Sequence, residues 1–177
     1  MEKPLTQGPD LPRVDTLPPP EMALACEAAG AAKAARDAVA LLVLGVLAGA
    51  FIAFGAVFMT VVMTGAGDLP FGVARLLGGL VFSLGLILVI VGGAELFTGD
   101  SLMIVACASR RIGWRALMRA WAIVYAGNIA GALGTAALVH LAGHYTFGGG
   151  GVGRTALTIA ATKAALPTMQ LFFLSVL

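Results

Sequence analysis

The residues best suited to chemistry lie in one short polar interruption of a long apolar run. Glu95, Thr98 and Asp100 fall within the stretch GGAELFTGDS, residues 92–101. Glycines loosen the backbone there, and a helix that begins near Gly99 points free N–H groups and the positive end of its dipole into the interruption. Together with the neutral Thr98 hydroxyl, such a helix end can bind a small anion weakly and reversibly. The rival interpretation makes Thr98 and Asp100 only helix caps.

The two carboxylates also have a structural interpretation. Ionisable side chains are expensive at membrane depth and are functional candidates by default. A carboxylate in the path of an anion would repel it, so we expect Glu95 to accept hydrogen bonds from unpaired N–H groups of the loop. We therefore assign Glu95, Gly99 and Asp100 to stabilising the loop.

Other kinds of site find little support. The chain has two cysteines, Cys26 and Cys107, and two histidines, His140 and His144. None of them has further ligand-type residues beside it, so we expect no metal site and no cofactor. No histidine joins the carboxylate pair within a span, which argues against a membrane-embedded enzyme. A formal charge of +2 without a basic, aromatic-rich stripe argues against nucleic acid. A purely structural membrane subunit would leave the costly polar break unexplained.

The elements that position these residues are membrane helices. Of 177 residues, 59% are apolar and only 11% are charged, and the mean hydropathy is +0.97, whereas soluble domains carry about 25% charged residues. The chain is therefore an integral membrane protein, with spans expected at about 38–64, 71–109 and 120–142 and a partial span from about 168. As one helix the second span would reach nearly 60 Å, about twice a bilayer core, so we expect a break near 92–99.

This break could be a hairpin that reaches water or a loop near the bilayer middle within one crossing. Lys33 and Arg36 precede the first span, and four arginines follow the second: Arg110, Arg111, Arg115 and Arg119. One interrupted crossing places both basic groups on the same side, as the positive-inside rule favours. We therefore expect a multi-pass protein of the inner (plasma) membrane with a cytoplasmic N-terminus.

The two ends of the chain differ in character. Residues 1–20 are proline-rich without the apolar core of a signal peptide, and we expect a disordered cytoplasmic tail. Residues 21–37 suit either an amphipathic helix on the membrane surface or a solvated helix. The last span stops ten residues after Pro167, roughly 15 Å and about half a bilayer, so the sequence looks truncated.

Two pairs of glycines four residues apart predict close packing of helices, Gly45 with Gly49 and Gly127 with Gly131. The alternative is that these glycines have no packing role, since glycine is common in membrane helices.

The stretch from Pro70 to Asp100 closely resembles the formate/nitrite transporter family, in its PFG start, its FSLGLIL helix and its ELFTG break. RIGW at 111–114, VYAGNIAGAL at 124–133 and Lys163 also fit, and the resemblance covers about residues 20–177. It implies an all-α, aquaporin-like protomer of inverted three-helix halves, of which this chain carries the first. It also implies a homopentamer with one substrate path in each protomer.

The resemblance further implies transport of a small monovalent anion, commonly coupled to protons. Formate is the leading substrate implied by the resemblance. Nitrite and hydrosulfide, which members of the same family also transport, are the alternative substrates. By position, Phe82, Leu86, Leu96 and Phe97 would form apolar constrictions, and Thr98 would supply the central hydroxyl. Lys163, which from the residues alone we would expect to snorkel, would line the outer vestibule. The family's second interrupted helix and its histidine would lie beyond residue 177, so a truncated, non-conducting fragment is the other alternative.

Overall fold

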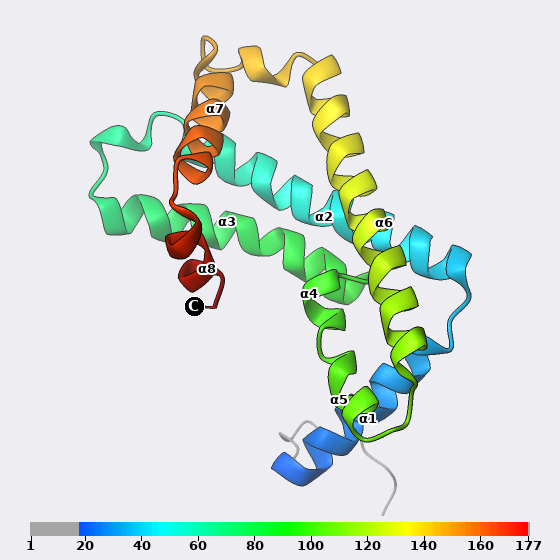
Figure 1. Ribbon diagram of the computed structural model, residues 1–177. Helices are drawn as coiled ribbons and strands as arrows, with labels where there is room; N and C mark the ends of the chain where they lie inside the picture. Colours follow the sequence, from blue (N-terminus) through cyan, green and yellow to red (C-terminus); the bar gives the residue numbers. More distant parts are fainter. Residues whose placement is uncertain (1–17, 177) are drawn as a thin grey trace, which may run out of the picture.

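The computed structural model describes residues 18–176 (Figure 1), and this part of the chain consists of helices and turns without a strand. The helices are α1 (Pro19–Ala34), α2 (Ala38–Met63), η1 (Ala66–Asp68), α3 (Phe71–Val91), α4 (Phe97–Asp100), α5 (Met103–Ala108), α6 (Trp114–Leu141), η2 (His144–Thr146), α7 (Gly151–Ala164) and α8 (Thr168–Val176). The expected disordered tail lies outside the described residues, apart from Pro18, Pro19 and Pro20.

Within the described residues, α2, α3 and α6 are each long and apolar enough to cross a membrane. The chain is therefore a multi-pass membrane protein. Helices α7 and α8 pass the same test as a pair, but they meet at an angle of 104°. Pro167 lies at this bend, where it removes an N–H donor and restricts the residue before it.

Helices α2 and α6 cross where the sequence predicts close packing. A Cβ atom on Gly49 would come within 2.1 Å of a carbonyl oxygen of α6, and one on Gly131 within 2.0 Å of a carbonyl oxygen of α2. Gly45 lies against Gly127 one turn earlier. Because residue numbers rise together along the crossing, α2 and α6 run parallel, and glycine is required there because the backbones touch.

Helix α3 packs on α2 in the opposite direction. Gly85 lies against the backbone of Phe51 and Ile52, while Gly78 lies against Met63. Since α6 runs parallel to α2, the chain between them makes one return pass through α3, the break and α5. A hairpin at the break would have set α6 antiparallel to α2. The structure therefore has the interrupted second helix that the charges predict.

The break lies off-centre along α2. The backbone N–H of Glu95 donates to the carbonyl of Leu44 at 3.2 Å, and Leu44 lies about 9 Å from the N-terminal end of α2. The break thus lies nearer to that end of α2 than to its middle. Helix α3 alone has 21 residues, about 32 Å, so it covers most of the crossing before Gly92.

Several helix ends differ from the predicted boundaries. Helix α1 begins at Pro19, because a proline in the first turn lacks only an N–H that would have no helical partner. Helix α6 begins at Trp114, six residues before the expected start of the third span, since a helix continues beyond the hydrocarbon core and its arginines can reach water. Helix α1 packs against α5, with Gly30 facing Met103 and Ala106.

Candidate functional site

The turn that creates the break depends on Gly93. Helix α3 ends at Val91 with Gly92 as its C-cap residue, and Gly93 adopts a φ of +62°, a conformation that side chains disfavour. The N–H of Ala94 returns to the carbonyl of Val89 at 3.0 Å. The chain then runs extended to Leu96, and the short helix α4 starts at Phe97.

Asn128 of α6 holds the extended part of the break. Its Oδ1 accepts from the N–H of Phe97 at 2.9 Å, and its Nδ2 donates to the carbonyls of Gly45 at 2.8 Å and Glu95 at 3.0 Å. One amide thus joins three helices and satisfies backbone groups that would be costly without partners in a membrane. Sequence reasoning missed Asn128, although a lone amide within a long apolar helix was a usable signal.

Replacing Asn128 with alanine should destabilise the protein by about 1–3 kcal/mol, because one N–H and two carbonyls near the break lose their partner. Thermal unfolding in detergent measures the effect. Ser83→Ala is a matched control, since the exposed Ser83 hydroxyl only donates to a carbonyl of its own helix. An unchanged unfolding midpoint in the Asn128 variant would show that the amide does not hold the break.

Four charged side chains meet beside the break, and we call Lys33, Arg36, Glu95 and Asp100 the inner cluster. The Lys33 Nζ lies 2.5 Å from Glu95 Oε2 and 2.5 Å from Asp100 Oδ1. The Nη1 of Arg36 contacts Glu95 Oε1. Both carboxylates are buried, with 2% and 1% exposed. Buried charges need such partners, so the inner cluster fastens α1 to the break.

The partners of Glu95 correct the sequence-based expectation. Among the described residues its carboxylate pairs with Lys33 and Arg36, not with N–H groups of the loop. Two amides next to this carboxylate already have other partners, because Glu95 N–H donates to the carbonyl of Leu44 and Phe97 N–H donates to Asn128. The two cations reside on α1 and in the turn after it, far away in sequence, and sequence reasoning did not connect them with the break.

The cations of the inner cluster keep their charge. Burial alone would lower the pKa of Lys33, but hydrogen bonds and attraction from Asp100 and Glu95 outweigh it and raise that pKa above its usual value. An arginine guanidinium stays protonated in proteins. The two carboxylates therefore favour the charged form of Lys33.

A cavity of about 550 Å³ opens beside the inner cluster. Of the residues selected from the sequence, Leu86, Glu95, Leu96, Thr98 and Gly99 line it, and Lys33 and Arg36 of the inner cluster line it too. Helix α4 has no side-chain cap, and its N-cap residue is Leu96. Neither Thr98 nor Asp100 therefore caps this helix, and Thr98 is one of the residues that line the cavity.

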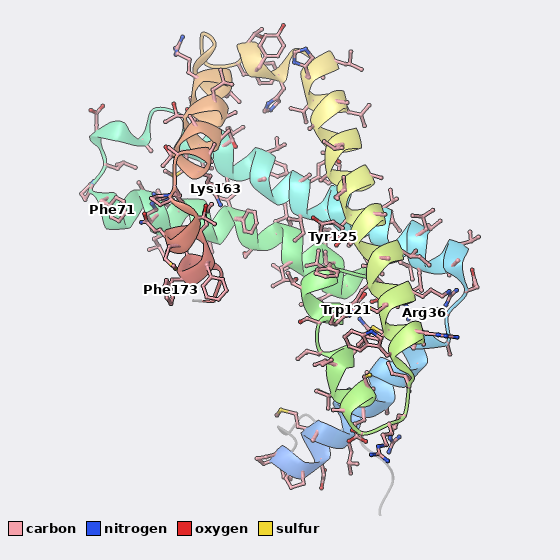
Figure 2. The ribbon with its side chains drawn as sticks, viewed as in Figure 1. Arg36, Phe71, Trp121, Tyr125, Lys163 and Phe173 are labelled. Atoms are coloured by element: carbon pink, nitrogen blue, oxygen red, sulfur yellow. The ribbon has the colours of Figure 1, made fainter. Side chains whose placement is uncertain are left out.

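Four other selected residues do not line this cavity, and one of them, Asp100, contacts Lys33 in the inner cluster. Phe97 packs its ring edge-to-face on Trp121 and Tyr125 of α6, with centroids 5.9 and 5.2 Å apart; Figure 2 labels both partners on α6. Phe82, which is 36% exposed, lies one turn before Leu86 on α3 and does not line the cavity.

Lys163 is the last of these residues, and it lies at the other end of the bundle. With Arg75 and Arg154 it lines a second cavity of about 820 Å³, which also includes Met63 and Thr64 at the C-terminal end of α2. Figure 2 shows Lys163 well apart from Arg36 and Trp121. The two cavities therefore lie at opposite ends of α2, and both carry positive side chains.

Comparisons with known proteins agree with this architecture. The formate/nitrite transporter family matches residues 20–177. The formate channel FocA of Escherichia coli K12 is 44% identical over 149 residues, 84% of this chain and 52% of that protein. A probable formate transporter of Methanothermobacter thermautotrophicus is 37% identical over 150 residues, 82% of this chain and 54% of that protein.

A solved structure is similar as well. A pentameric formate channel with formate bound aligns with a TM-score of 0.71 and 43% identity, over 75% of this chain and 52% of that chain. The chain thus spans about half the length of the relatives that it matches.

Proposed function

Because the chain belongs to the formate/nitrite transporter family, we propose that it forms a transmembrane path for small monovalent anions, with formate as the leading substrate. The observation that carries this proposal is the cavity at the break, where Thr98 and the apolar Leu86 and Leu96 share one wall with two cations. A neutral hydroxyl between apolar side chains can replace part of an anion's hydration without trapping it. Nitrite and hydrosulfide are the alternative substrates.

We assign the parts of the path as follows. Phe82, Leu86, Leu96 and Phe97 form apolar constrictions, Thr98 donates a hydrogen bond to the passing anion, and Lys163 attracts anions into the outer vestibule. Glu95, Gly99 and Asp100 keep the break in shape. The ring of Phe97 packs against Trp121 and Tyr125 of α6 beside this path.

We propose a homopentamer in the inner (plasma) membrane with a cytoplasmic N-terminus. The pentameric assembly of the similar formate channel supports this state. The topology is supported by the parallel course of α2 and α6, which places Lys33 and Arg36 on the same side as the arginines that precede and begin α6. In this arrangement the break faces the cytoplasm and Lys163 lies outside.

The test is formate flux into liposomes that contain the protein expressed from its own complete reading frame. We expect saturable formate uptake above the leak of empty liposomes, with nitrite as a competitor. Flux carried by the protein separates a transporter from a structural subunit. Absence of formate, nitrite and hydrosulfide flux from a well-folded oligomer would overturn the proposed function.

A further inference from the structure

Three cationic side chains without an acidic partner line the second cavity, of about 820 Å³, which we call the outer cavity. Arg75 comes from the start of α3, while Arg154 and Lys163 come from the two ends of α7. Within residues 18–176 no ion pair involves any of them, and the Arg75 guanidinium only lies over the Phe71 ring, 5.1 Å from its centroid. Figure 2 labels Phe71 and Lys163 on the two helices that border the outer cavity. Unlike the inner cluster, this cavity holds uncompensated positive charge.

The neighbouring polar groups do little to offset this charge. The hydroxyls of Thr64, Thr158 and Thr162 each donate to the backbone carbonyl four residues earlier. Asp68 stands in the turn between α2 and α3, outside the residues that line the cavity. Three cations less this one carboxylate still leave two positive charges. An anion that enters the outer cavity therefore meets the three cations as its main hydrogen-bond donors.

We propose that the outer cavity binds a phosphate group with two negative charges, which blocks the entrance of the path and does not pass through it. This inference rests on the proposed function and adds an inhibitor of it. Two negative charges match the excess of positive charge, whereas a monovalent anion leaves part of that excess uncompensated. Arginine is well suited to phosphate because its guanidinium offers paired N–H donors, and the outer cavity has two arginines beside one lysine.

The same double charge prevents passage. The cost of moving an ion into surroundings of low dielectric constant rises with the square of its charge, so it is about four times larger for a dianion than for formate of similar radius. Leu86 and Leu96, which we assign to the apolar constrictions, impose this cost further along the path. A bound phosphate group thus stays in the outer cavity and cancels the positive charge that attracts formate.

The phosphate group has two possible sources, free phosphate in water and the headgroup of phosphatidic acid. The outer cavity lies at the C-terminal end of α2, where that helix leaves the membrane. Its wall includes apolar side chains of α2 and of the turn that follows: Met59, Met63 and Leu69. Both sources offer the same dianionic group, and a binding experiment separates them.

Calorimetric titration in neutral detergent measures binding to the protein expressed from its complete reading frame, at a pH above the second ionisation of phosphate. The probes are inorganic phosphate and a short-chain, water-soluble phosphatidic acid, with sodium chloride of equal ionic strength as the blank. Binding of inorganic phosphate identifies a free ligand, and binding of phosphatidic acid alone identifies a lipid headgroup. The affinity should fall about tenfold or more in Arg154→Gln and in Arg75→Gln, the usual effect of losing a charge-assisted hydrogen bond. Arg115→Gln, at an exposed position near the start of α6, should bind like the wild type.

Formate flux into liposomes of neutral lipid tests the block. At a formate concentration well below saturation, phosphate on both sides at about ten times its measured Kd should lower wild-type flux about tenfold relative to chloride of equal ionic strength. The same phosphate concentration should lower the flux of Arg154→Gln only about twofold. If phosphatidic acid alone binds, liposomes that contain it take the place of free phosphate.

A wild type that binds neither probe would overturn the inference, and so would two glutamine variants that bind as tightly as the wild type. Formate flux that stays unchanged while the ligand is bound would overturn it as well. Absence of formate flux from the wild type in chloride would instead overturn the proposed function, and the titrations would still decide whether the outer cavity is a phosphate site.

Discussion

Replacing Lys33 with methionine should destabilise the protein by about 3–5 kcal/mol, the usual cost of breaking a buried ion pair from one side. Methionine preserves much of the length of the lysine stem but cannot pair with a carboxylate. Asp100 would lose its cation and Glu95 one of two, while both remain buried. Thermal unfolding in detergent should show a midpoint lowered by about 10 °C or more.

The matched control for Lys33→Met restores the charge balance. The double variant Lys33→Met, Asp100→Asn removes one anion together with the bridging cation and leaves the Arg36–Glu95 pair, and it should recover a large part of the lost stability. Replacement of a buried ion pair by neutral groups of similar shape is often close to neutral. A midpoint of Lys33→Met within about 2 °C of the wild type would show that α1 does not need this contact to stay docked.

Replacing Thr98 with valine should lower formate flux by roughly tenfold or more, as expected for the loss of a hydrogen bond of about 1.5–3 kcal/mol to a charged group. Valine keeps the shape of threonine and the apolar wall of Leu86 and Leu96, so the change isolates the donor. An anion at an apolar constriction has few donors to replace its hydration, and each one matters. Initial formate flux into liposomes at matched protein content measures the effect.

Thr98→Ser retains the hydroxyl and should keep most of the flux. Since α4 has no side-chain cap, neither variant should alter the helix start, and the oligomer size in detergent should stay that of the wild type. Wild-type formate flux through the valine variant, with the fold intact, would remove Thr98 from the transport path.

The parts of the site that could be predicted from sequence are those that lie close together along the chain. Hydropathy alone indicates helices at α2, α3 and α6, because a bilayer selects long apolar segments. Two adjacent glycines followed soon after by ELFTGDS mark the break in the sequence. Residues of this stretch are close together along the chain, and several of them line the same cavity in the structure. The direction of α6 followed from the distribution of arginines.

The parts that could not be predicted depend on contacts between distant residues. Lys33 is 62 residues from Glu95, and no local pattern indicates which cation reaches which carboxylate. Asn128 is 31 residues from Phe97, although its amide in an apolar helix was a signal. The depth of the break depends on how far α3 extends before Gly92, and the position of the Phe97 ring depends on aromatic partners on α6.

The attachment of α1 to the break has a consequence for the synthesis of the protein, because the paired residues lie far apart along the chain. Lys33 leaves the ribosome before the carboxylates that it neutralises, which follow 62 and 67 residues later. Glu95 and Asp100 therefore reach the translocon without partners unless α1 is held nearby. The short link of residues 35–37 ties α1 to the first membrane helix and keeps its cations within reach. A bulky fusion placed next to α1 should therefore lower the amount of protein folded in the membrane, because α1 carries the cation that pairs with both carboxylates of the break.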